Sequence, residues 1–393
     1  MKKIALIGLL IVPTALIISS YTNSTTLTKK RNTVLMPHPL PVVLPPGTKI
    51  KIALLLDTSN SMDGLIEQAK SQLWKLVNEL AKFKTNNEKP ELEIALYEYG
   101  NDLLDAKEGY IRQISMFTND LDVISEKLFS LKTNGGNEFC GHVIQTSLNQ
   151  LDWVGNENLQ IIFIAGNEPF TQGGVSYQVS CEKAKEKSVY VNTIFCGSYD
   201  EGVRTDWKNG AVLTAGSYMN IDHNQKTAYV ETPFDSAIEA LNDKLNATYV
   251  YYGVSGVSKK SMQIQQDKNA SAYGKANTTE RIISKSSSFY KNSSWDLVDA
   301  SEEKDFDITK VKEENLPSEL KGKTNEYKIN YVAAKKKERE LINSEIAELN
   351  KKRTVFILEK QKTSVVSSNS LDAVMISAIK DQAAKKGFAL ASN

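Results

Sequence analysis

The segment Lys51–Met62, with the sequence KIALLLDTSNSM, constrains the fold more than any other part of the chain. Its apolar run Ile52–Leu56 shows no alternation, which is typical of a strand covered on both faces in a parallel sheet. Asp57 ends the run, and apolar residues at helical spacing from Leu65 to Leu80 predict an amphipathic helix. The polar residues between them therefore lie at the carboxyl end of a strand, where open α/β sheets bind ligands.

Strands and helices alternate over the next two hundred residues. Further strands are predicted at Leu92–Tyr99, Tyr110–Phe117, Leu159–Ala165, Val189–Cys196 and Ala211–Gly216, with a possible edge strand at Thr248–Gly253. Helices are predicted at Leu121–Leu131, Gly141–Leu151, Gln178–Lys187 and Pro233–Asn246. This order predicts an α/β fold with a doubly wound, mostly parallel sheet and helices on both faces.

The loop after the first strand has the composition of a cation site. Asp57, Ser59 and Ser61 offer only oxygen atoms from alternate positions. Oxygen ligands suit Mg²⁺, Mn²⁺ or Ca²⁺ better than Zn²⁺. A loop in which Asp57 only caps the following helix is the simpler alternative.

The pattern D-x-S-x-S resembles the metal-ion-dependent adhesion site of von Willebrand factor A (VWA) domains, and the resemblance covers Lys51 to about Asn246. It implies a VWA/Rossmann-like fold in which two further loops complete the site, one with a threonine after Gly-Gly and one with an aspartate after the fourth strand.

Both further loops depart from the family pattern. Asn137 stands where the threonine is usual, with Thr133 and Glu138 close by, and Asn167 or Glu168 replaces the aspartate. The resemblance therefore implies one ligand set for Mg²⁺, or for Mn²⁺ or Ca²⁺, namely Asp57, Ser59, Ser61, Asn137 and Glu168.

A cation held by only a few protein oxygens has one coordination position left open for a partner. In the family, a carboxylate of the partner takes that position. The resemblance thus implies a metal-dependent protein-binding module, an adhesion or scaffold protein rather than an enzyme, whose partner offers an Asp or Glu. We expect the surrounding loop residues to frame this contact, namely Asn60, Met62, Asn134, Phe139 and Phe170.

Two other functions stay open. A metal-assisted hydrolase or phosphoesterase would need a base, which Glu168 could supply, although the chain has no G-x-S-x-G, P-loop or H-E-x-x-H motif. A structural envelope protein would need only that the amide ligands are too weak to hold a metal.

The N-terminus predicts export. Residues 1–22 carry two lysines and then an apolar segment, as in a signal peptide or N-terminal anchor, and residues 23–49 form a proline-rich spacer. We therefore expect a periplasmic, cell-envelope or secreted protein that meets the membrane only through its N-terminal segment. The net charge of +1 gives no reason to expect nucleic-acid binding.

The C-terminal third has a different character. We expect a VWA-like domain over residues 50–250 and a mainly helical polar extension over 251–393. Within the extension, helices are predicted at Tyr327–Lys362 and Ser370–Gly387, and Trp295–Ala300 is an apolar patch that could dock on the domain.

The chain has three cysteines. Export permits a disulfide, and a Cys140–Cys181 pair with Cys196 free is the preferred arrangement. A zinc site that also includes His142 and His223 is the alternative, although the tight C-x-x-C spacing is missing.

Overall fold

A six-stranded sheet forms the centre of the computed structural model, which describes residues 47–85, 88–224, 230–363 and 370–390. The strand order is β4-β3-β1-β5-β6-β7; β4 runs antiparallel to β3, and the other neighbours are parallel. The strands are β1 (Lys49–Asp57), β3 (Glu91–Tyr99), β4 (Ile111–Thr118), β5 (Leu159–Gly166), β6 (Val189–Cys196) and β7 (Tyr218–Ile221). The predicted doubly wound, mostly parallel sheet is confirmed.

Strand β1 lies in the middle of this sheet, between β3 and β5, and is buried on both faces. Ile52 and Leu54 belong to the core on one face, while Ala53 and Leu55 belong to the core on the other. Its apolar run therefore has no exposed side, as the missing alternation indicated.

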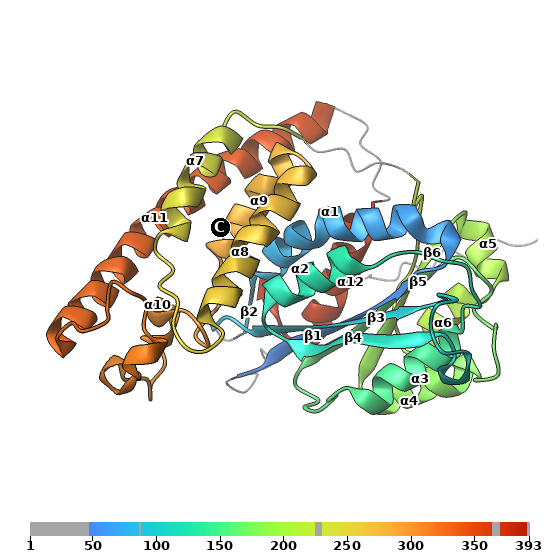
Figure 1. Ribbon diagram of the computed structural model, residues 1–393. Coiled ribbons are helices and arrows are strands. Elements are labelled where there is room, and N and C mark those ends of the chain that lie inside the picture. Colours follow the sequence, from blue (N-terminus) through green and yellow to red (C-terminus); the bar gives the residue numbers. More distant parts are fainter. Residues whose placement is uncertain (1–46, 86–87, 225–229, 364–369, 391–393) are drawn as a thin grey trace, which may run out of the picture. The chain divides into compact units, whose positions relative to one another are not determined.

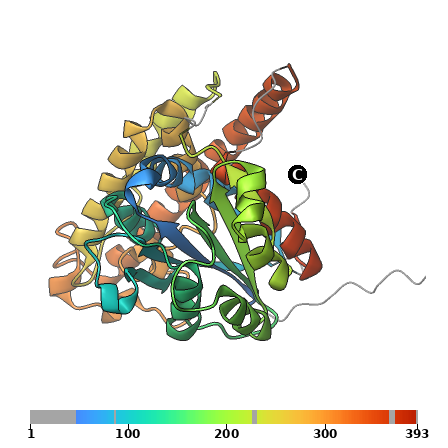
Figure 2. The ribbon, with the colours of Figure 1, turned by 90° about the vertical axis from the view of Figure 1, so that its right-hand side faces the viewer.

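Helices cover both faces of the sheet (Figures 1 and 2). One face carries α1 (Asp63–Leu80), α2 (Leu121–Ser130) and α12 (Leu371–Lys385). The other carries α3 (Cys140–Gln150), α4 (Tyr177–Glu186) and α6 (Trp207–Leu213), with the short α5 (Tyr199–Arg204) beside α6.

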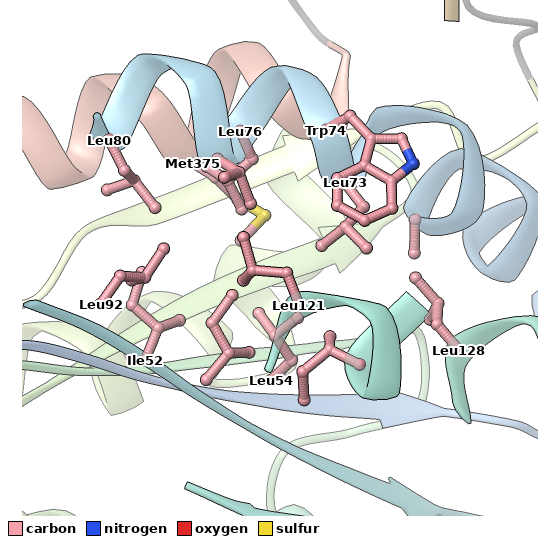
Figure 3. Close-up of a cluster of buried hydrophobic side chains, with 14 of the residues drawn as sticks. Ile52, Leu54, Leu73, Trp74, Leu76, Leu80, Leu92, Leu121, Leu128 and Met375 are labelled. Atoms are coloured by element: carbon pink, nitrogen blue, oxygen red, sulfur yellow. The ribbon is translucent and has the colours of Figure 1, made fainter. Parts of the chain in front are cut away.

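Helix α12 belongs to the first of these layers although it follows the helices of the second layer in the sequence. Figure 3 shows Met375 of α12 close to Leu76 of α1, above the strand residues Ile52 and Leu54. Polar contacts fix its position as well: Asp372 N donates to Gln72 Oε1 at 2.6 Å. A short antiparallel pair, β2 (Phe83–Lys84) and β8 (Ala389–Leu390), follows α1 and α12.

The remaining helices form a second layer outside α1 and α2. They are α7 (Asp235–Asn246), α8 (Gly256–Ala272), α9 (Lys275–Lys285), α10 (Leu297–Ala300) and the 39-residue α11 (Asn325–Thr363). Short 3₁₀ turns lie at Asn60–Met62, Ala106–Glu108, Ile308–Lys310 and Glu313–Asn315. Within the described ranges, no helix has both the length and the apolar character needed to cross a membrane.

Buried ion pairs join the two layers. Arg281 of α9 is fully buried; its Nη2 lies 2.7 Å from Asp122 of α2, and its Nε lies 2.9 Å from Asp267 of α8. Its guanidinium also stacks on Trp74 of α1 at 4.3 Å. Lys285 contacts Asp267 as well, at 2.7 Å. Two cations thus face two carboxylates in largely buried surroundings, which fixes α8 and α9 on the sheet-covering helices.

Two further buried arginines hold α11. Arg339 pairs with Asp296 at 2.7 Å and stacks on Tyr249 at 3.9 Å, and Arg353 pairs with Asp235 of α7 at 2.9 Å. The predicted docking patch at Trp295–Ala300 is buried, and Trp295 is part of the core on the α1 side.

Two predicted strands are wrong. Residues 211–216 lie in α6 and the turn after it, because a short apolar run fits a buried helix as well as a strand. Thr248–Gly253 forms only an isolated bridge between Tyr251 and Asp296.

The predicted signal segment and nearly all of the spacer lie outside the described residues. The boundary at residue 250 stays a prediction, and the described residues all belong to one compact unit.

Candidate functional site

The three predicted ligands of the first loop lie together at the end of β1. Asp57 is fully buried, and its Oδ1 accepts a hydrogen bond from Ser59 N at 2.8 Å. This turn aims the Ser59 side chain toward Ser61, and their hydroxyl oxygens lie 3.3 Å apart. Ser59 O then accepts from Met62 N, which starts the 3₁₀ turn leading into α1. The alternate spacing therefore places one carboxylate and two hydroxyls on the same side of the loop.

The second loop, residues 131–139, passes close to the first. Asn134 N donates to Thr58 O at 2.9 Å, and Gly136 lies against the backbone of Gly100, where a Cβ would come within 1.9 Å of the carbonyl oxygen. Asn137, the predicted ligand, is exposed. Glu138 is only 4% exposed, and it interacts with both Asp57 and Ser59. The carboxylate nearest the first loop is thus the residue after the predicted one.

The third loop, after β5, contributes at the mouth of the site. Asn167 Nδ2 donates to Ser61 Oγ at 3.2 Å, whereas the Glu168 side chain is exposed. The backbone of Glu168 is well anchored, since its carbonyl accepts from Trp207 Nε1 at 2.8 Å. The structure therefore brings Asp57, Ser59 and Ser61 together with Asn167 and leaves Asn137 and Glu168 on the surface, where their role as ligands stays a prediction.

Two glycines make room for the buried carboxylates. At Gly100, with φ +79°, a Cβ would lie 2.6 Å from Glu138 Cγ and 2.8 Å from Asp57 Oδ1. At Gly166, a Cβ would lie 2.6 Å from the Tyr99 hydroxyl and 3.1 Å from Asp57 Oδ2. Sequence reasoning missed both, although an isolated glycine directly after a buried strand marks a close approach.

The electrostatics favour a bound cation. Burial, and next the charge of Glu138, raise the pKa of Asp57 well above its ordinary value. Burial likewise raises the pKa of Glu138. Asp57 Oδ2 and Glu138 Oε2 are both buried without a hydrogen-bond partner, although buried polar atoms are normally paired. A cation near these oxygens would offset the charge and satisfy both atoms.

The donor set consists of carboxylates, hydroxyls and an amide, so it fits a hard divalent cation. In the part of the chain that the structure describes, no three His, Cys, Asp or Glu side chains surround a common metal position. A cation here would therefore depend on the serine hydroxyls, and Mg²⁺ as its identity stays a prediction.

The expected frame of the site needs correction. Met62 and Phe170 are fully buried, because Met62 packs under α1 and Phe170 packs between Tyr177 and Trp207. Leu103 is 81% exposed instead. It belongs to the loop after β3, whose Asp102 touches Gly135 of the second loop.

The preferred disulfide is wrong. Cys140, Cys181 and Cys196 are all buried free cysteines. Cys140 Sγ lies 3.8 Å from the Tyr99 hydroxyl, and burial raises the pKa of each of the three thiols. The described residues form no zinc cluster with His142 or His223.

Comparison with known proteins finds matches among solved structures. No family model and no curated protein matches the chain. BatB from Bacteroides thetaiotaomicron matches with 15% identity over 44% of this chain and 90% of that chain, with a TM-score of 0.35. The SpRpn10 VWA domain matches with 18% identity over 44% of this chain and 88% of that chain, with a TM-score of 0.34. The structural neighbours thus include VWA domains.

A third match is proximal thread matrix protein 1 from the mussel byssus, in a structure described as having a zinc-occupied MIDAS motif, the metal-ion-dependent adhesion site. It shows 12% identity over 45% of this chain and 43% of that chain, with a TM-score of 0.35.

Proposed function

We propose that this protein is a VWA-like module that binds a divalent cation at the end of β1 and holds a protein partner through it. The observation that carries the proposal is the buried Oδ2 of Asp57, which has no hydrogen-bond partner. In the same loop, the hydroxyl oxygens of Ser59 and Ser61 lie 3.3 Å from each other. A buried carboxylate oxygen without a partner is costly unless a cation binds it.

The cation we propose is Mg²⁺, with Mn²⁺ and Ca²⁺ as alternatives. Asp57, Ser59 and Ser61 would hold it, the second loop would add a ligand, and the exposed Glu168 would act from the third loop. The mouth of the site faces solvent at Ser61 and Asn167, so an external oxygen ligand can reach it. An Asp or Glu of a partner protein has the complementary charge.

Recognition accounts for these features better than turnover does. Asp57, the buried acid of the first loop, is shielded from solvent, so it can hold a cation but a substrate cannot reach it directly. We therefore propose a binding protein and not an enzyme.

The test is thermal unfolding of the full chain with and without Mg²⁺, Mn²⁺ or Ca²⁺. A cation that binds only the folded state raises its stability by about 2.7 kcal/mol at a concentration 100 times the Kd. We expect this rise in the parent and in Asp305→Ala, which removes an exposed carboxylate of the C-terminal region, and we expect none in Asp57→Asn.

The other two functions give different results. Absence of any cation effect in the parent supports a structural protein with a degenerate site. Metal-dependent hydrolysis of a phosphoester or carboxyl ester panel, lost in Asp57→Asn, supports a hydrolase and contradicts the binding module.

We propose export to the periplasm, cell envelope or medium on the basis of residues 1–22. Residues 1–50 fused to a reporter that works only outside the cytoplasm should give activity. An inactive but stable fusion would reverse this assignment.

A further inference from the structure

Glu138 is the one residue of the second loop that turns into the protein at the site. Its neighbour Asn137 is exposed, yet Glu138 is only 4% exposed. Glu138 N donates to Gln172 Oε1 at 2.8 Å, and this bond fixes the backbone at the point where the side chain turns inward. A carboxylate is rarely buried to this extent without a charged partner.

The surroundings of this carboxylate contain no cationic side chain that the structure records as a contact. It interacts with the Ser59 hydroxyl, with Asp57 and with the backbone N–H of Glu168. Its Oε2 is nevertheless buried without a hydrogen-bond partner, just as Asp57 Oδ2 is. Two buried carboxylates therefore stand next to each other, and each has one free oxygen.

Gly100 shows that both carboxylates enter the same small space. A Cβ on this residue would lie 2.6 Å from Glu138 Cγ and 2.8 Å from Asp57 Oδ1. The two side chains thus approach one point of the backbone just after β3 from the two loops. A cation that binds both carboxylates would satisfy their free oxygens, Asp57 Oδ2 and Glu138 Oε2.

We propose that Glu138, not Asn137, is the second-loop ligand of the cation, and that it occupies from inside the position that a partner's carboxylate would take. The inference rests on the proposed cation site. Asp57 and Glu138 together neutralise the charge of a divalent cation, so a third carboxylate gains little by binding to it. The parent protein is therefore self-ligated, and an acidic partner has to displace Glu138.

The proposal predicts opposite changes in two measurements on the full chain. Glu138→Gln keeps the size of the side chain and removes its charge. We expect the Kd for Mn²⁺, measured by isothermal titration, to rise about tenfold or more. At saturating Mn²⁺ we expect acetate, used as a carboxylate probe, to bind the metal several-fold more tightly, seen as faster relaxation of its methyl protons.

Two variants serve as controls. Asn137→Ala alters the adjacent exposed residue and should change neither measurement. Glu138→Asp keeps the charge but shortens the side chain by one methylene, so we expect values between those of the parent and Glu138→Gln. It also provides a second test if Glu138→Gln does not fold.

Several results would overturn the inference. An unchanged Mn²⁺ affinity in Glu138→Gln would show that Glu138 is no ligand, while the proposed function would survive. Weaker Mn²⁺ binding without stronger acetate binding would show that Glu138 does not block the open position. If the parent itself binds no Mn²⁺, the proposed function fails, and the inference fails with it.

Discussion

At the scale of single residues, the site depends as much on glycines as on its oxygen donors. Gly100 has no side chain, so the side chains of Asp57 and Glu138 can both pack against its backbone at the end of β3. Any side chain there would clash with Asp57 and Glu138, which are both buried in close-packed surroundings.

Gly100→Ala tests this. We expect a loss of about 1–3 kcal/mol in the free energy of unfolding from overpacking, together with loss of the cation effect on melting. Gly322→Ala is the matched control, because Gly322 has a similar φ of +69° but no atom within 4 Å of its Cβ position. It separates backbone strain from crowding, and equal losses in the two variants would contradict a crowded cavity.

The sequence predicted the first loop well and the others poorly, for a physical reason. Asp57, Ser59 and Ser61 are local: one turn after a strand brings them together. The burial of Glu138 depends instead on contacts far apart in the chain, such as the bond between Asn134 and Thr58. Residue spacing contains no information on such contacts.

At the scale of elements, the sheet was predictable and its covering layer was not. Apolar runs of a few residues identify strands in the sequence. The predicted bounds lie close to the observed ones for five strands, namely β1, β3, β4, β5 and β6. Which helix covers which face depends on tertiary packing. The helix predicted at Ser370–Gly387 is confirmed as α12, but the sequence did not predict that it packs beside α1 on the sheet.

Met375→Ala tests the contribution of α12. Met375 is buried between α1 and the sheet (Figure 3), so its truncation leaves a cavity. We expect a loss of about 2–5 kcal/mol in chemical denaturation. Lys385→Ala, an exposed change in the same helix, should cost less than about 0.5 kcal/mol. If Met375→Ala also costs less than about 0.5 kcal/mol, α12 is not part of the core.

Asp267→Asn tests the buried charges between α8 and α9. The variant leaves Lys285 and Arg281 buried without one of their counter-charges. We expect a loss of about 3–5 kcal/mol at neutral pH, measured by denaturant unfolding. Asp243→Asn, an exposed change on α7, should have almost no effect. If Asp267→Asn and Asp243→Asn are equally stable, the ion pairs of Asp267 with Lys285 and Arg281 do not stabilise the fold.

The same residue predicts a pH dependence. Burial tends to raise the pKa of Asp267, but Lys285 and Arg281 outweigh it and hold the pKa well below its ordinary value. The unfolded chain therefore takes up a proton at higher pH than the folded one, so this stabilisation is complete above about pH 5 and is lost progressively as the pH falls below it. Between pH 5 and pH 2, the free energy of unfolding should fall more steeply for the parent than for Asp267→Asn. An equal fall in both proteins would contradict a lowered pKa of Asp267.

At the scale of the whole molecule, the part after residue 250 completes the core of the part before it. Ile282, Trp295, Ile346 and Met375 all belong to the same buried cluster as the strand residue Leu54. The division into residues 50–250 and 251–393 stays a prediction, and buried side chains from both parts belong to this one cluster.

A fragment ending at residue 250 tests this directly. Without α8, α9 and α12, the outer sides of α1 and α2 and the part of the sheet under α12 would be exposed. We expect the fragment to show no cooperative thermal transition and to bind a hydrophobic dye, while the full chain melts cooperatively. A sharp transition in the fragment would establish residues 50–250 as an independent domain.

The position of α12 also decides when the protein can fold during its synthesis. Because side chains of α12 (Leu371–Lys385) fill the space between α1 and the sheet, a growing chain cannot close that layer until α12 has been synthesised. The hydrogen bond between Gln72 of α1 and Asp372 of α12 joins residues 300 positions apart, so closure is slow compared with formation of local helices. A chain that loses α12 to a premature stop or to proteolysis therefore leaves an apolar layer open to aggregation.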